Sequence, residues 1–174
     1  PSPVLNEKIR KNLASKAFDL LSDYDNKVAN YLSDNKSLKT NVSQKLNKLR
    51  YGENPHQSGY IQINETENGI ANSILISGKE MSYNNYLDAD IAFNSTNNFN
   101  ENCVSIVKHT NICGLSINSN QLRAFNDAVK GDPVSAYGGI LGFNSLLEED
   151  VAKEIIKSFF EIVIAPNFSH QALE

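Results

Sequence analysis

The stretch that decides the fold is Cys103-Val104-Ser105-Ile106-Val107, which ends at Lys108-His109. A continuous run of apolar and β-branched residues is typical of a strand that is buried on both faces of a sheet. The pattern after it predicts a helix over 122–130, a strand over 139–143, a helix from Ser145 to about Phe160 and a strand over 161–166. Because strands separated by helices are joined by right-handed crossovers, the sequence predicts an α/β fold with a mostly parallel sheet.

The residues before this strand divide into a helical part and a part rich in turns. Apolar residues at helical spacing predict one long amphipathic helix or a pair of helices: Leu5, Ile9, Leu13, Ala17, Leu20, Leu21, Tyr24, Val28, Tyr31 and Leu32. We expect a helical segment and polar lead-in over 1–48, and an α/β unit over 49–174, in one domain overall. Two β-like runs, 60–63 and 73–77, precede a helix that we expect Asn85 to cap, with Asp88 three residues later.

Composition limits the classes of partner. The 174 residues are 40% hydrophobic and carry a formal net charge of −4, so there is no general basic field to hold nucleic acid or an anionic membrane. The two cysteines form no CxxC pair and adjoin no histidine cluster, which argues against a disulfide framework and a structural zinc. No apolar run approaches the roughly 20 residues that span a bilayer, and no signal peptide is evident, so we expect a cytoplasmic protein.

Lys108 and His109 are candidate catalytic residues, because ligands of open α/β sheets collect beyond the carboxyl ends of the strands. An imidazole can accept a proton from a weakly nucleophilic amine. A neighbouring ammonium can stabilise a developing oxyanion or protonate a leaving nitrogen. The pair therefore favours group transfer, although either side chain could equally be a solvated strand terminus, and the turn expected at Gly114 is as ambiguous.

Other segments combine polar groups with tight turns. The octet Arg50-Tyr51-Gly52-Glu53-Asn54-Pro55-His56-Gln57, together with the run over 108–111, suits a phosphorylated, nitrogen-rich small molecule. His56 alone is typical of a loop histidine, and Arg50 of a surface cation. Gly138 and Gly139 either let backbone N–H groups approach a ligand or serve a steric turn. Neither GxGxxG nor a P-loop occurs, so dinucleotide and nucleoside triphosphate sites of those kinds lack support.

Five segments, in order, resemble the AICAR transformylase region of the AICAR transformylase/IMP cyclohydrolase family. They are LRYGENPHQ over 49–57, GKEMSYNN over 78–85, VKHTNICG over 107–114, DPVSAYGG over 132–139 and IAP over 164–166. The resemblance implies transfer of a formyl group from 10-formyltetrahydrofolate to the 5-amino group of AICAR, in the de novo purine route to IMP. It implies that His109 accepts the amine proton and that Lys108 stabilises the transition state. The residues that it associates with AICAR binding are Arg50, Tyr51, Asn84, Asn85, Gly138 and Glu161.

The resemblance also implies a three-layer α/β/α, cytidine-deaminase-like unit, the first of two such units in a homodimer. The folate site would then lie largely in the second unit, and the chain would be a fragment of a longer protein that also carries IMP cyclohydrolase. Ile112 stands where the family usually has proline, so the turn after His109 would be less rigid. The zinc of true deaminases is not expected, because the H-x-E and P-C-x-x-C patterns do not occur.

Two alternatives stay open. The chain could be a catalytically silent module for ligand binding or dimerisation, because the folate half would be missing. A cytidine-deaminase-like hydrolase would require tightly bound zinc, and a metal analysis would detect it.

Overall fold

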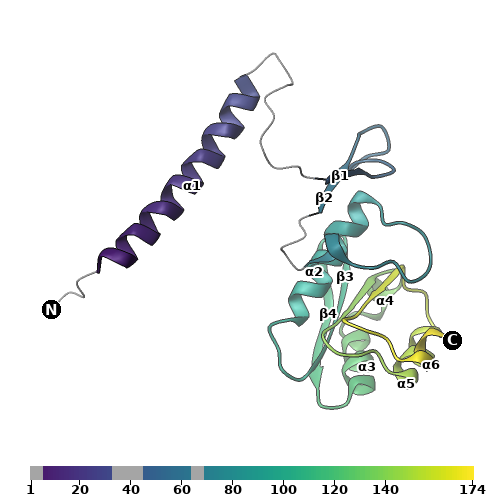
Figure 1. Ribbon diagram of the computed structural model, residues 1–174. Helices are drawn as coiled ribbons and strands as arrows, with labels where there is room; N and C mark the ends of the chain where they lie inside the picture. Colours follow the sequence, from purple (N-terminus) through teal and green to yellow (C-terminus); the bar gives the residue numbers. More distant parts are fainter. Residues whose placement is uncertain (1–5, 33–44, 64–68) are drawn as a thin grey trace. The chain divides into compact units, whose positions relative to one another are not determined.

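The computed structural model describes residues 6–32, 45–63 and 69–174 (Figure 1). The chain forms two compact units, Pro1–Ser43 and Gln44–Glu174. The described part of the first unit is dominated by one helix, and the second unit contains two sheets with the remaining helices. The predicted helical stripe begins at Leu5, and most of the predicted polar lead-in covers 33–44; both lie outside the described residues.

The helix α1, Glu7–Leu32, is one continuous helix, the first of the two predicted possibilities. Its first turn is capped by Asn6, whose side-chain oxygen accepts a hydrogen bond from the Ile9 amide at 2.9 Å. Exposed ion pairs one turn apart, Lys11–Glu7 and Lys27–Asp23, add about 0.3–0.5 kcal/mol each. None of its residues is buried. No helix in the described ranges is both long and apolar enough to cross a membrane.

The larger sheet has four strands in the order β4-β3-β5-β6. These are β3, Asn102–Lys108; β4, Asn111–Asn118; β5, Ile140–Phe143; and β6, Ile162–Ile164. β3 pairs antiparallel with both β4 and β5, whereas β5 and β6 are parallel. The α/β fold class is therefore confirmed, but the expectation of a mostly parallel sheet is wrong. β4, β5 and β6 share one direction, as the alternation of helices and strands implies, and β3 runs against them because a hairpin joins it to β4.

Helices cover both faces of this sheet, which gives the three layers that we expected. On one face α2, Tyr83–Thr96, packs Ala89 and Ala92 against Val107 and Ile140. On the other face, α3, Gln121–Gly131, and α5, Glu149–Ile155, cover the side chains of β3 and β5. The buried residues of this second cluster include Val104, Ile106, Leu141, Phe143, Ala124, Phe125, Ala128 and Val151.

Two glycines let the helices approach the sheet closely. A β-carbon at Gly142 would lie 2.2 Å from the Ala92 carbonyl oxygen, and one at Gly114 would lie 2.2 Å from that of Ala128. Neither position can accept a larger residue without moving a helix backbone. Gly114 therefore lies inside β4 and packs against α3, which corrects its expected place in a turn.

The smaller sheet pairs β1, Lys45–Lys48, antiparallel with β2, Tyr60–Ile63. The octet lies between these strands, which bring its two ends together. The predicted strand over 73–77 is wrong, because these residues have no regular structure and their apolar side chains are exposed. This segment follows the short helix η1, Ile70–Asn72, and leads into α2.

Helix ends differ in detail from the prediction. Ser82, rather than Asn85, is the N-cap of α2, and Asn85 is the reciprocal partner of a capping box. The helix expected from Ser145 to about Phe160 instead begins at Glu149 and ends at Ile155, and Glu148 occupies its N-cap without a side-chain bond. Two short helices, α4, Pro133–Ala136, and α6, His170–Leu173, were not predicted.

Candidate active site

The candidate residues meet at one edge of the larger sheet because of the reversed direction of β3. Lys108 ends β3, whereas Gly138 and Gly139 come just before β5 and Glu161 just before β6. In register, Val107 pairs with Ile140, and Ile140 pairs with Ile162. The end of β3 and the beginnings of β5 and β6 therefore lie side by side. In the mostly parallel sheet that we expected, with β3 parallel to β5, Lys108 would lie at the opposite edge from Gly138 and Glu161.

His109 and Thr110 form the two-residue turn between β3 and β4. Their φ angles are +53° and +61°, both in the left-handed region. A two-residue hairpin turn with positive φ at both positions normally contains asparagine or glycine. Residues held in this region cost of order 1–3 kcal/mol each and are concentrated at functional sites. The expected catalytic histidine thus lies on a strained turn.

The turn is held by a carboxylate from α2. Asp88 Oδ2 accepts a hydrogen bond from the His109 amide at 3.1 Å, and Oδ1 accepts one from the Thr110 amide at 2.7 Å. The His109 carbonyl oxygen accepts bonds from Thr110 Oγ1 at 2.7 Å and from Asn111 Nδ2 at 2.8 Å. His109 is exposed, and its hydrogen bonds to other described residues all involve its main chain. The residue is thus exposed on a fixed backbone.

Lys108 is half-buried beside the turn that precedes β5. Its Nζ donates to the Tyr137 carbonyl oxygen at 2.6 Å. Gly138 has a φ of +72°, its amide donates to the Phe159 carbonyl at 2.8 Å, and a β-carbon there would lie 3.9 Å from Lys108 Nζ. The ammonium has three donor protons and uses one for Tyr137, so its position is fixed while it keeps capacity for a ligand.

Asn85 and Glu161 join α2 to the start of β6. Asn85 Nδ2 donates to Glu161 Oε1 at 2.9 Å, while Asn85 Oδ1 accepts from the amide and the hydroxyl of Ser82 at 3.0 and 2.7 Å. The capping box thus fixes which way the amide of Asn85 points. The Glu161 amide also donates to the Gly139 carbonyl at 3.0 Å. Glu161 is therefore attached both to α2 and to the glycine pair beside Lys108.

The octet forms a compact loop that reaches α2. The Gly52 amide donates to the Gln57 carbonyl at 2.7 Å, and the side chain of Gln57 accepts from the Asn54 amide at 2.8 Å. Asn84 Nδ2 donates to the Glu53 carbonyl at 3.2 Å, which links the loop to the first turn of α2. Arg50 is exposed and lies 5.6 Å from the centroid of the Tyr51 ring.

These contacts connect most, but not all, of the expected site. Lys108 is bonded to the Tyr137 carbonyl next to Gly138, and Asn85 and Glu161 form a second bonded pair that reaches the same turn through Gly139. Asn84 connects the octet to α2, but no described hydrogen bond joins Arg50 or Tyr51 to Lys108. His109 follows Lys108 in the chain, and its side chain has no described hydrogen bond with the other candidates.

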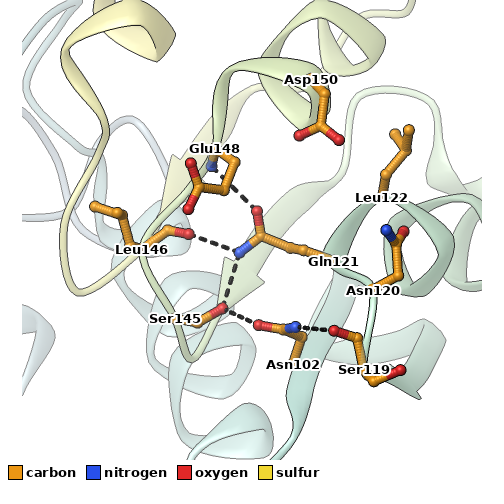
Figure 2. A pocket seen from close by; sticks show the side chains of 9 residues that line it. All are labelled: Asn102, Ser119, Asn120, Gln121, Leu122, Ser145, Leu146, Glu148 and Asp150. Carbon is orange, nitrogen blue, oxygen red and sulfur yellow. Dashed lines mark hydrogen bonds between the residues drawn. The ribbon is translucent and has the colours of Figure 1, made fainter.

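A polar pocket lies at the other end of β3, away from Lys108 (Figure 2). Gln121 lies at its centre: its amide nitrogen donates to Ser145 Oγ and to the Leu146 carbonyl, both at 2.8 Å, and its oxygen accepts from the Glu148 amide at 3.1 Å. Ser145 in turn donates to Asn102 at 2.7 Å. Because these groups satisfy one another, the pocket joins α3 to the loop before α5, and it contains none of the predicted site residues.

Comparison with known proteins decides the family. A family model described as "AICARFT/IMPCHase bienzyme" matches residues 3–174. The chain belongs to the AICARFT/IMPCHase family. The resemblance that five short segments indicate is therefore confirmed over nearly the whole chain.

The relatives of this AICARFT/IMPCHase chain come from distant organisms. The bifunctional purine biosynthesis protein PurH of Clostridium botulinum is 38% identical over 172 residues, which cover 96% of this chain and 34% of that protein. PurH of Aquifex aeolicus is 41% identical over 172 residues, with 94% and 34% covered. PurH of Dictyostelium discoideum is 40% identical over 190 residues, with 94% and 35% covered. The chain spans about a third of the length of these curated relatives.

Three titratable groups of this AICARFT/IMPCHase chain have shifted pKa values that bear on its chemistry. Burial raises the pKa of the Cys103 thiol, and burial is also the largest cause of the raised pKa of Cys113, so both thiols are poor nucleophiles at neutral pH. Hydrogen bonds from the Ser135 hydroxyl and amide lower the pKa of Asp132, the N-cap of α4. Within the described ranges, no group of at least three His, Cys, Asp or Glu residues could hold a metal ion. The absence of zinc remains a prediction.

Sequence reasoning missed the turn and the residue that holds it. We interpreted Asp88 as a helix-cap neighbour of Asn85, but its carboxylate reaches the hairpin. The available signal was the alternation of apolar residues at Cys113, Leu115 and Ile117, which follows β3 after a turn with no glycine or asparagine at its two positions. The contact of Asp88 is tertiary, and no local pattern could reveal it.

Proposed function

We propose that this chain is the AICAR-binding and proton-transferring part of an AICAR formyltransferase. The reaction transfers a formyl group from 10-formyltetrahydrofolate to the 5-amino group of AICAR in the de novo route to IMP. The observation that carries the proposal is the meeting of Lys108, Gly138 and Glu161 at one sheet edge, beside the strained turn of His109. Membership of a family whose relatives are named bifunctional purine biosynthesis proteins supports it.

His109 accepts the proton that the amine must lose. As the amine nitrogen bonds to the formyl carbon, it becomes positively charged, and the exposed imidazole removes its proton. The bond between that carbon and N10 of the folate then breaks, and the leaving nitrogen gains a proton. The products are the formamido nucleotide and tetrahydrofolate, so one formyl group is exchanged for one proton.

Lys108 stabilises the negative charge that develops on the formyl oxygen. An ammonium held in place before the reaction needs no reorganisation when the charge appears, which is the basis of electrostatic catalysis. The 2.6 Å bond to the Tyr137 carbonyl provides this fixed position. The half-buried environment of Lys108 also reduces screening of its charge by water.

AICAR has a carboxamide, a ribose and a phosphate, and the remaining candidates offer complementary groups. Arg50 supplies a cation for its anionic or carbonyl oxygens, and Tyr51 a ring and a hydroxyl. Gly138 permits close approach of the backbone, because it has no side chain. Glu161, with Asn84 and Asn85 nearby, supplies acceptors and donors for the carboxamide and the ribose.

The rest of the catalytic unit is also part of the proposal. The folate co-substrate binds largely outside these residues, the longer protein acts as a homodimer, and it carries IMP cyclohydrolase as well. We further propose a cytoplasmic location. Because the chain spans about a third of its relatives, we expect it to show no formyl transfer alone.

Complementation tests this division of labour. The chain is first assayed for formyl transfer alone. It is then assayed with the part of a relative's transformylase region that the chain does not cover, for example that of PurH of Aquifex aeolicus. This part is either fused to the chain or added in trans. We expect turnover only in the complemented form. Activity of the chain alone would place the folate site within these residues. A silent binding or dimerisation module would instead give a complex that stays inactive although AICAR binds.

A further inference from the structure

We propose that Asp88 is the positioning residue for His109, acting through the hairpin turn rather than on the substrate. This inference rests on the proposed function, because it assigns a catalytic purpose to the orientation of His109. Asp88 belongs to α2, so its position is set by a helix that packs on the sheet, and not by the turn itself.

Both oxygens of the carboxylate are used, and each accepts from a different amide of the turn. Oδ2 is 3.1 Å from the His109 nitrogen and Oδ1 is 2.7 Å from the Thr110 nitrogen. Because two adjacent N–H groups must point at one carboxylate, the peptide plane between His109 and Thr110 is fixed. That plane sets the direction in which the His109 β-carbon leaves the backbone.

The intrinsic backbone preferences of the two turn residues do not favour this conformation. Thr110 is β-branched, and a β-branched residue with positive φ is an outlier that the surroundings must impose. The carboxylate of Asp88 is such an influence, since it accepts a hydrogen bond from each of the two amides while both residues are in the left-handed region. The 2.7 Å bond from Thr110 Oγ1 to the His109 carbonyl acts in the same direction.

The side chain of His109 has no hydrogen-bond partner among the described residues that could orient it directly. In many general bases, a second side chain orients the imidazole by accepting its other N–H. Here the structure offers orientation through the main chain instead. We therefore expect Asp88 to matter for turnover more than for AICAR binding.

The first measurement uses this chain alone and does not depend on catalysis. Amide hydrogen exchange, followed by NMR, reports whether the His109 and Thr110 amides are bonded. In D88N the side chain offers one neutral acceptor oxygen in place of two charged ones, so one bond is lost, the other is weakened, and we expect faster exchange at both positions. D90N changes the same charge at an exposed position on the same helix and should leave both amides protected.

The second measurement is kinetic and uses the complemented protein. We expect D88N to lower kcat by up to about 10²-fold, the scale of a small misplacement of a catalytic group, with little change in KM for AICAR. D90N should behave like the wild type. Replacing Thr110 by glycine in the D88N chain should restore part of kcat, because glycine adopts positive φ without the carboxylate. This double variant also keeps the test available if D88N alone fails to fold.

Several results would overturn the inference. One is unchanged exchange in D88N, which would show that the amides do not depend on the carboxylate. Another is normal kcat in D88N while H109A abolishes turnover, in which case the proposed function stands and Asp88 does not position its base. A rise in KM with kcat unchanged would make Asp88 a binding residue. Normal turnover in H109A would remove both the proposed function and this inference.

Discussion

The side chain of Asn85 donates a hydrogen bond to the carboxylate of Glu161 across 2.9 Å, and so connects residues that are 76 positions apart in the chain. The bond joins the first turn of α2 to the residue before β6. It also places an acidic side chain at the candidate site, because Glu161 is the only acid in the described structure whose side chain is hydrogen-bonded to a capping residue of α2.

We predict that Glu161→Gln weakens AICAR binding. The substitution keeps the shape and a neutral hydrogen bond to Asn85, but it removes the charge that strengthens a bond to a ligand donor. A calorimetric titration should show a Kd for AICAR that is about tenfold higher, which corresponds to near 1.4 kcal/mol of binding free energy. Glu101→Gln, at an exposed position before the opposite end of β3, is the control. Equal affinity in the two variants would remove Glu161 from the site.

Gly138→Ala should destabilise the chain and reduce turnover. The β-carbon would find ordinary contact distances, 3.7 Å from the Phe159 ring and 3.9 Å from Lys108 Nζ. The cost therefore comes from the φ of +72°, at roughly 1–2 kcal/mol for a non-glycine residue. Thermal unfolding gives the stability, and the complemented assay gives kcat. Gly69→Ala, where a β-carbon meets nothing within 4 Å, should change neither.

Arg50→Ala should act mainly on AICAR affinity. A charge-assisted contact to an anionic or carbonyl oxygen of the nucleotide is worth on the order of 1.5–3 kcal/mol when it is shielded from water. Calorimetry with AICAR measures the change directly. Arg123→Ala removes another exposed arginine, on α3, and should bind AICAR normally. If both variants bind alike, Arg50 is a surface cation.

Asp132 gives a pH-dependent test of the turn before β5. Bonds from the Ser135 hydroxyl and amide lower the pKa of its carboxyl group, so the ionised form adds stability above the unfolded pKa of about 3.9. That contribution is lost as the pH falls through the lower, folded pKa.

Ser135→Ala removes the hydroxyl donor, the largest cause of the shift, and should raise the pKa of Asp132 toward its ordinary value. An NMR titration of the side-chain carboxyl carbon measures this directly. Ser158→Ala, at an exposed position, is the control. A titration curve that Ser135→Ala does not move would show that the hydroxyl bond does not hold the carboxylate.

The spacing of apolar residues predicted the helices and strands whose own sequence has a clear apolar pattern. The helices α1 and α3 follow from apolar spacing, and β3, β5 and β6 follow from short apolar runs between turn residues. The hairpin could not be predicted in the same way. Its turn is His109-Thr110, and the left-handed conformation of both residues depends on Asp88, a tertiary contact that the local sequence does not encode.

The direction of β3 shows how a correct pattern led to a wrong topology. The strands β4, β5 and β6 do share one direction, but the sequence pattern does not reveal β4, so it predicts β3 as a parallel neighbour of the later strands. The candidate residues were found by chemistry and resemblance, whereas their meeting at one edge depends on the antiparallel pairing of β3 and β5. Strand direction is therefore the property that turns separate sequence motifs into one site.

The most direct test of the central claim is the turnover of His109→Ala in the complemented protein. With AICAR binding checked by calorimetry, the account predicts that kcat falls by about 10²–10⁴-fold while AICAR still binds. His170→Ala replaces an exposed histidine on α6 and should keep normal turnover. Near-normal formyl transfer by His109→Ala would contradict the assignment of His109 as the proton acceptor.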